Sequence, residues 1–154
     1  MGAAHVIDDG INPAALLAGF SSANPFAGAV VSFTGQMRGM ADDGGMLTAL
    51  HLESYRGMTL ASIEAIVAEA MAKFAITDSL AVHRIGRILP GEAIVFVATA
   101  AVHRRAAFDA ADWLMDQLKS KAMLWKREER ADGTAAWIEP TVADHDALSR
   151  WEQP

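Results

Sequence analysis

Three stretches with helical character are each followed by a pair of β-prone runs in this 154-residue chain, and this order limits the folds open to it. The clearest helix carries apolar residues at steps of three and four between Ile63 and Phe74. The first helix begins at an Asn12–Pro13 cap, and the third runs from about Arg104 to Ala122. Because two strands separate successive helices, the order is not a strict β–α–β alternation. We therefore expect an α+β fold, with a mixed, mainly antiparallel sheet and helices packed on it.

The β-prone runs are recognised by their β-branched and apolar residues, and turn residues bound them. They span residues 28–37, 46–55, 79–85, 93–101, 124–129 and 134–139. We expect the second run to lie antiparallel to the first, across a polar, flexible loop at 39–45. The last two runs flank Asp132–Gly133 and predict a C-terminal β-hairpin, and a short helix is expected at 144–151.

Composition favours one domain spanning residues 1–154. Hydrophobic residues make up 52% of the chain, enough for a core, and no linker divides it. No apolar run approaches the roughly 18 residues of a membrane span. The N-terminus lacks the basic start and apolar segment of a secretion signal. We therefore expect a cytoplasmic protein without a membrane partner.

Net charge and cysteine content exclude several classes of function. A net charge of −6 argues against a nucleic-acid-binding protein, which is usually basic. The absence of cysteine excludes disulfides, a cysteine nucleophile and thiolate metal sites. The five histidines lack the spacing of a zinc motif, and no phosphate-binding or dinucleotide-binding motif occurs. We expect neither a metal nor a cofactor.

Three of the four lysines lie within eight residues: Lys119, Lys121 and Lys126. A cluster of cations in an acidic chain indicates an anionic partner. A partly buried lysine can also lose its proton and act as a base or nucleophile. The alternatives are a solvated helix end, whose dipole favours cations, and for Lys126 an exposed strand lysine paired with Glu128.

A second group of cations, His103 and Arg104, lies where the third helix begins. Free N–H groups at a helix start and the guanidinium fork both favour an anion, although an ordinary surface turn is the alternative. Fifteen residues separate Arg104 from Lys119, which is roughly 22 Å along a helix. One helix cannot bring both ends to one small ligand. The site is therefore elongated, or other segments or a second subunit complete it.

Two residues of the first β-run are further candidates. Arg38 follows the strand beside the polar loop, a position where binding groups are common. Phe33 precedes it and either belongs to the core or flanks a flat ligand.

Motifs along most of the chain resemble the large, catalytic subunit of molybdopterin synthase. In the second half they are His83-Arg-Ile-Gly86, Leu89-Pro-Gly-Glu92, Ile94-Val-Phe-Val97, His103-Arg104, Ala107-Phe108, Leu118-Lys119 and Trp125-Lys-Arg-Glu128. In the first half they are Gly28-Ala-Val-Val31, Phe33-Thr-Gly35, Arg38, Leu52-Glu53, Tyr55 and Gly57-Met58. The resemblance covers about residues 28–139, and its specificity comes from the order and spacing of the motifs.

The resemblance implies an α/β hammerhead-type fold and a homodimer flanked by two small sulfur-carrier subunits, a heterotetramer. Each carrier is ubiquitin-like and ends in Gly-Gly bearing a thiocarboxylate. The implied reaction is a sulfurtransferase reaction that places two sulfurs on cyclic pyranopterin monophosphate and forms the dithiolene of molybdopterin. The alternative is a non-catalytic dimeric module that docks the carrier tail. Retention of Lys119 and Lys126 together with His103-Arg104 favours catalysis.

The resemblance also implies residue roles. Lys119 would lie beside the terminal glycine of the carrier and assist acyl transfer, and Lys126 would donate or accept a proton. Substrate would be held by Arg38, His103 and Arg104, in a pocket shaped by Phe33 and Met115.

The chain departs from the family pattern at two places. Met123 stands where members often have proline, and we expect a looser helix end there. Pro140-Thr141 stands where some members carry arginine. If that arginine binds substrate, another group such as Arg130 must replace it, or phosphate binding is weaker.

Overall fold

The computed structural model describes residues 2–55, 57–138 and 147–152. The strands are β1 (Ala3–Ile7), β2 (Ala29–Gln36), β3 (Leu47–Ser54), β4 (Ile76–Arg84), β5 (Gly86–Ile88), β6 (Ala93–Ala101), β7 (Leu124–Arg130) and β8 (Ala135–Ile138). The helices are α1 (Pro13–Ala23), α2 (Met58–Lys73) and α3 (Arg104–Lys121). The three predicted helices and the C-terminal hairpin are confirmed. The terminal helix expected at 144–151 begins outside the described residues, and positions 147–149 are helical.

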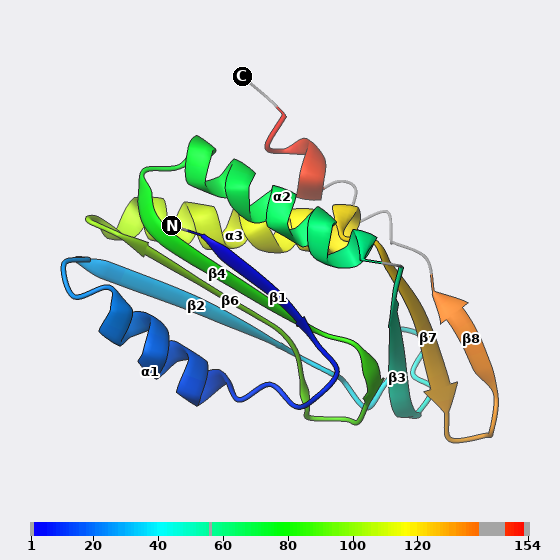
Figure 1. Cartoon of the computed structure of the whole chain (residues 1–154). Coiled ribbons are helices and arrows are strands. Elements are labelled where there is room, and N and C mark those ends of the chain that lie inside the picture. Colours follow the sequence, from blue (N-terminus) through cyan, green and yellow to red (C-terminus); the bar gives the residue numbers. More distant parts are fainter. Residues whose placement is uncertain (1, 56, 139–146, 153–154) are drawn as a thin grey trace.

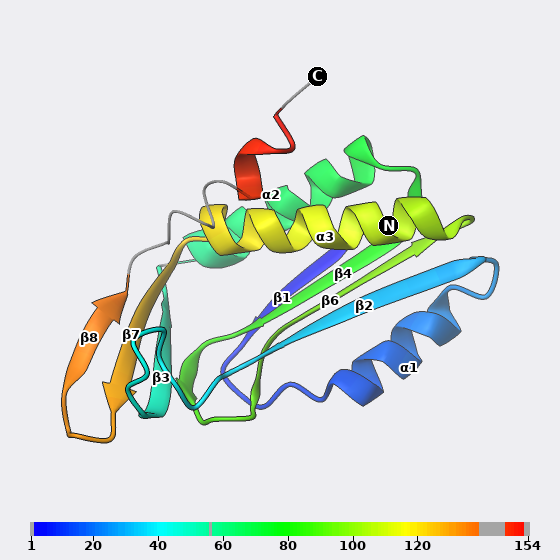
Figure 2. The same ribbon diagram turned by 180° about the vertical axis from the view of Figure 1, so that it is seen from behind.

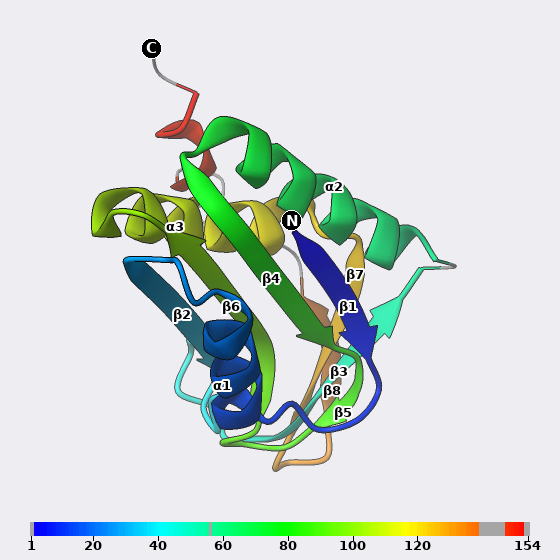
Figure 3. The same ribbon diagram turned by 60° about the vertical axis from the view of Figure 1, so that its left-hand side comes forward.

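Four strands form the first sheet, in the order β1-β4-β6-β2. β1 runs parallel to β4, and the other pairs are antiparallel. Helices α2 and α3 lie on one face and α1 on the other, so the sheet is the middle layer (Figure 1, Figure 3). The mixed, mainly antiparallel arrangement confirms the expected α+β fold.

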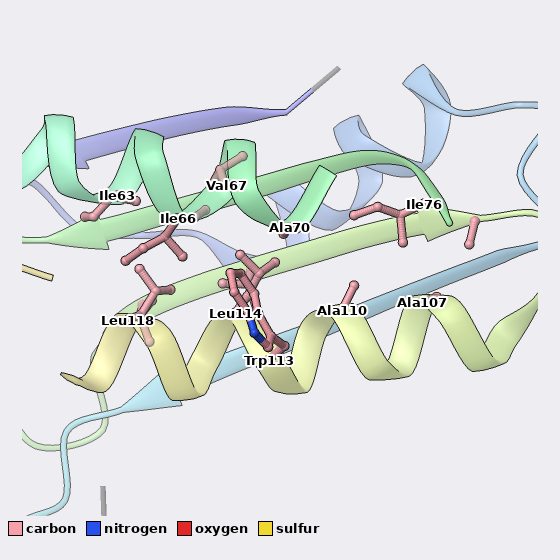
Figure 4. Close-up of a cluster of buried hydrophobic side chains, with 14 residues drawn as sticks. Ile63, Ile66, Val67, Ala70, Ile76, Ala107, Ala110, Trp113, Leu114 and Leu118 are labelled. Atoms are coloured by element: carbon pink, nitrogen blue, oxygen red, sulfur yellow. The ribbon is translucent and has the colours of Figure 1, made fainter. Parts of the chain in front are cut away.

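Two apolar clusters hold these layers together. Between the sheet and helices α2 and α3, the periodic face of α2 meets Trp113, Leu114 and Leu118 of α3 (Figure 4). On the opposite face, Phe20 of α1 packs on Phe96 of β6. Because burial of apolar area is the main driving force of folding, α3 is fixed along its length against the sheet.

The second sheet, β5-β3-β7-β8, stands at one end of the first (Figure 1). The expected pairing of residues 46–55 with 28–37 is therefore wrong. β2 pairs along its length with β6, while β3 pairs with β5 and β7. The physical reason is the apolar face of β3, whose Leu50 and Leu52 are buried with Met37 and Ile88 in a cluster of their own.

The helix ends follow local chemistry. Asn12 Oδ1 accepts the N–H of Ala15 at 3.1 Å, which confirms the predicted cap. Gly57 has a positive φ of 77° in the tight turn between β3 and α2. No helix in the described ranges is both long and apolar enough to cross a membrane.

Candidate functional site

The three clustered lysines lie on α3 and β7, close to the corner where the helix ends and the second sheet begins; Figure 2 shows this corner of the fold. Lys119 and Lys121 occupy the last turn of α3, and Lys126 is the third residue of β7. Only Ala122 and Met123 connect the helix to the strand. All three lysine side chains are exposed. We call Lys119, Lys121 and Lys126 the lysine junction.

Lys126 borders the apolar face of the second sheet. In the strand register it lies opposite Leu52 of β3 and Ile138 of β8, while Glu128 lies opposite Leu50. Because directly paired residues share a face, Lys126 and Glu128 lie on the same face of the sheet as Leu50 and Leu52. No ion pair joins Lys126 to Glu128 in the described part of the chain.

The opposite face of the second sheet is aromatic. Trp125 and Trp137 stack edge-on with ring centroids 6.2 Å apart, and the Arg127 guanidinium lies 5.9 Å from the Trp137 centroid. Both tryptophans are 56% exposed. Lys126 therefore points away from this aromatic face.

Phe33 and Met115 lie on the side of the first sheet that α3 covers. Phe33 pairs with Val97, whose side chain is in the core beneath α3, yet Phe33 remains 44% exposed at the outer strand. A Cβ atom on Gly35 would lie 3.3 Å from the Phe33 ring, so glycine makes room for it. Met115 is half-buried one turn before Lys119. The end of β2 and the C-terminal end of α3 both adjoin the second sheet (Figure 1, Figure 2).

Arg38 follows β2 and is exposed. Its Nη2 donates to Asp42 Oδ1 at 2.9 Å, and the two side chains are 74% and 79% exposed. An exposed pair of this kind contributes only about 0.2–1 kcal/mol. A stronger anion can therefore take the place of Asp42 on Arg38.

Arg130, considered above as a replacement for a missing arginine, already has a carboxylate partner. Its Nη1 and Nη2 donate to the two oxygens of Asp43 at 3.0 and 2.9 Å. The Arg130 guanidinium and then the Gly45 N–H lower the pKa of Asp43. Binding of phosphate by Arg130 would require it to leave Asp43. Pro140 and Thr141 lie outside the described residues.

His103 and Arg104 lie at the opposite end of α3 from the lysine junction. His103 precedes the helix with extended backbone, at φ −125° and ψ 145°, and its side chain makes no capping hydrogen bond. Arg104, Arg105 and Phe108 line a shallow surface pocket with two aspartates. Because α3 is one continuous helix, the chain does not bring this end to the lysine junction.

The connector between α3 and β7 has two partners that the sequence did not reveal. The Met123 N–H donates to Ser62 Oγ at 3.2 Å, and the Thr59 hydroxyl donates to the Met123 carbonyl. A proline could not make the first bond. Met123 is therefore held by α2, contrary to the looser helix end that we expected.

Two of the three histidines within strands, His51 and His83, have structural partners. His83 is buried, which lowers its pKa, and its Nδ1 lies 2.9 Å from the Arg84 carbonyl. His51 Nε2 lies 2.9 Å from Glu129, whose pKa is lowered by hydrogen bonds from His51 and then Arg87. Across the described ranges, no group of three or more His, Asp or Glu side chains could hold a metal ion.

Comparison with known proteins gives consistent matches. A family model described as MoaE protein matches residues 6–121, which include all of α3. The molybdopterin synthase catalytic subunit of Caulobacter vibrioides is 47% identical over 146 residues, covering 95% of this chain and 95% of that protein. The solved structure of the molybdopterin biosynthesis MoaE protein from Burkholderia ambifaria is 38% identical, with a TM-score of 0.82 and 100% coverage of both chains. Molybdopterin synthase from Staphylococcus aureus is 26% identical, with a TM-score of 0.76, covering 87% of this chain and 95% of that one.

Proposed function

The chain belongs to the MoaE family of molybdopterin synthase catalytic subunits, and from this premise we propose that it is a sulfurtransferase. It takes sulfur from the thiocarboxylated Gly-Gly terminus of a small, ubiquitin-like carrier subunit. Two such carriers in turn deliver two sulfurs to cyclic pyranopterin monophosphate, which together form the dithiolene of molybdopterin. The observation that carries this proposal is that Lys119, in the last turn of α3, and Lys126, the third residue of β7, flank the two-residue connector at one corner of the fold.

The two lysines take different parts in the reaction. Once the thiocarboxylate sulfur has bonded to the substrate, water attacks the acyl carbon of the resulting thioester, and the C–S bond breaks to leave sulfur on the substrate and a carboxylate on the carrier. That attack builds negative charge on the acyl oxygen, and the Lys119 ammonium stabilises it. Lys126 borders the apolar face of β3 and β7 and gives or takes a proton as sulfur adds to the substrate. Phe33 and Met115 line the pterin side of the pocket. The sulfur comes from the carrier because the chain contains no cysteine.

A second copy of the chain completes the phosphate site. Roughly 22 Å of helix separates Arg104 from Lys119, which exceeds the reach of one small phosphate ester. In a homodimer, His103 and Arg104 of one copy approach the lysine junction of the other and act with Arg38. One carrier on each copy then gives a heterotetramer.

A single-turnover assay tests the proposed reaction. The purified protein is mixed with thiocarboxylated carrier and cyclic pyranopterin monophosphate, and dithiolene product is sought by mass spectrometry. Product should form with the wild type and with Lys73→Ala, since Lys73 ends α2 and lies outside the junction. It should form about 100-fold or more slowly with Lys119→Ala, and not at all with a carrier that ends in an ordinary carboxylate. A stable complex with carrier but no product from the wild type would instead identify a docking module.

A further inference from the structure

The connector between α3 and β7 controls how two proposed catalytic groups face one another. Lys119 is in the last turn of α3 and Lys126 is the third residue of β7. Because only Ala122 and Met123 lie between these elements, a change in the connector backbone re-aims one lysine relative to the other. Something must therefore fix that backbone.

Both polar groups of the Met123 backbone bond to side chains in the first turns of α2. Ser62 Oγ accepts the Met123 N–H at 3.2 Å and donates to the Thr59 carbonyl at 2.7 Å. The Thr59 hydroxyl donates to the Met123 carbonyl and accepts the Tyr55 N–H at 2.9 Å. Thr59 is only 1% exposed, so its hydroxyl bonds within the protein and not to bulk water.

These hydrogen bonds also link the connector to the second sheet. Tyr55 directly follows β3, and the last residue of β3, Ser54, pairs with Leu124, the first residue of β7. Thr59 therefore ties the end of β3 to the connector that precedes β7. A shift of Met123 would break contacts to a helix and to a strand end at once.

We propose that Thr59 and Ser62 are positioning residues, which set the mutual geometry of Lys119 and Lys126 by holding the Met123 backbone. This inference rests on the proposed sulfur transfer. Thr59 is buried and Ser62 is half-buried, and the proposed reaction gives neither a contact with the substrate. Loss of either should lower kcat while leaving the KM for the pterin substrate unchanged, because the groups proposed to bind phosphate are elsewhere.

The hydrogen bond between Ser62 and Met123 can be removed by a substitution at either residue. Ser62→Ala deletes the acceptor, and Met123→Pro deletes the donor of the same bond. Ala122 already has φ −66° and ψ 129°, a conformation that suits the residue before a proline. Each variant should lose about tenfold in kcat, a fraction of the 100-fold that a 1 Å misplacement can cost. The double variant should lose no more kcat than the less active of the two single variants, because the same hydrogen bond is removed in all three proteins.

The hydrogen bonds of the Thr59 hydroxyl can be tested by removing the hydroxyl and then restoring it in a second variant. Thr59→Val keeps the volume but strands the Met123 carbonyl and the Tyr55 N–H, and kcat should fall up to about 100-fold. Thr59→Ser restores the hydroxyl and should recover most of the rate. Ser22→Ala on the exposed surface of α1 is the matched control. If Thr59→Val does not fold, the half-buried Ser62 still allows the test.

Two readouts are independent of activity. The Met123 amide should exchange faster with deuterium in Ser62→Ala than in wild type. A short amine-reactive cross-linker should join Lys119 to Lys126 less efficiently in each variant, measured by mass spectrometry. Unchanged cross-linking, or an unchanged kcat in variants that only melt earlier, would overturn the positioning role. Absence of product from the wild type would overturn the proposed sulfur transfer, and the cross-linking result would still decide the positioning role.

Discussion

The two ends of α3 both carry cations, but the chain holds them in different ways. At the C-terminal end, the lysine junction is backed by the connector, α2 and the second sheet, and its neighbours are largely fixed. At the N-terminal end, His103 and Arg104 occupy an open helix start whose cap side chain bonds nothing in the helix. Precise geometry is what catalysis of group transfer requires, whereas binding an anion tolerates adjustment. This difference fits the proposed roles, with chemistry at the first end and substrate affinity at the second.

The largest expected loss of activity comes from removing Lys119, and it should distinguish this residue from Lys121 in the same turn. Lys119→Ala should lower kcat by about 100- to 1,000-fold, because it removes the charge that we propose stabilises the transition state. Lys121→Ala changes the same charge in the same turn and should retain most of the rate. Single-turnover product formation measures both. Melting temperatures should move by about 2 °C or less for either exposed lysine. Equal losses in the two variants would mean that net charge alone matters at this end.

Mixing two impaired variants, at a substrate concentration far below the raised KM of the second, tests whether the two ends of α3 that form one site belong to different copies. Lys119→Ala and the double variant His103→Ala with Arg104→Ala each lack one end. If a dimer pairs opposite ends, random exchange of subunits should restore about a quarter of wild-type activity, since half of the dimers are mixed and each has one intact site. Activity that stays at the level of the separate variants would mean that both ends serve one chain, or that the N-terminal end has no role.

A smaller effect, on KM and not on kcat, is expected from a single substitution at the N-terminal end of α3. Arg104→Ala should raise the KM for the pterin substrate about tenfold or more, the contribution of one charged hydrogen bond, with kcat nearly unchanged. Arg105→Ala, the adjacent exposed arginine, serves as the control. A fall in kcat at constant KM would reverse the roles given to the two ends.

The smallest expected change in KM comes from removing the aspartates that form ion pairs with Arg38 and Arg130. Asp42→Asn should lower the KM about twofold by freeing Arg38 from an exposed ion pair. Asp43→Asn frees Arg130 instead. A lower KM in the Asp43 variant would support Arg130 as the replacement for the missing arginine, and an unchanged KM would exclude it. Initial rates at low substrate concentration measure both.

The sequence predicted the helices and most strands because their signals are local. The apolar face of α2 repeats at helical spacing, and the run 93–101 is β-prone throughout and is identical in extent to β6. Two short strands were missed. β1 has five residues and β5 three, too few for a pattern to stand out.

Contacts between distant residues could not be predicted in the same way. Residues 28–37 and 46–55 are close in sequence, but whether they pair depends on the partners β6 and β7, which come much later. Thr59 and Met123 are 64 positions apart, and a threonine near a helix start has an obvious local use as a cap. The lysine cluster could be recognised in the sequence because its members are close neighbours. The residues that hold the adjoining connector could not, because they lie far away in the sequence.

The parallel pairing of β1 with β4 has a consequence for how the chain folds. Ala3 lies opposite Leu80, so β1 has no partner strand until synthesis has passed residue 84. Closing so long a loop costs conformational entropy before any strand contact compensates for it. We expect β1 to join the sheet late, after the antiparallel strands β4 and β6 have formed a template. During translation, the N-terminal segment would remain available to chaperones for longer than any other strand.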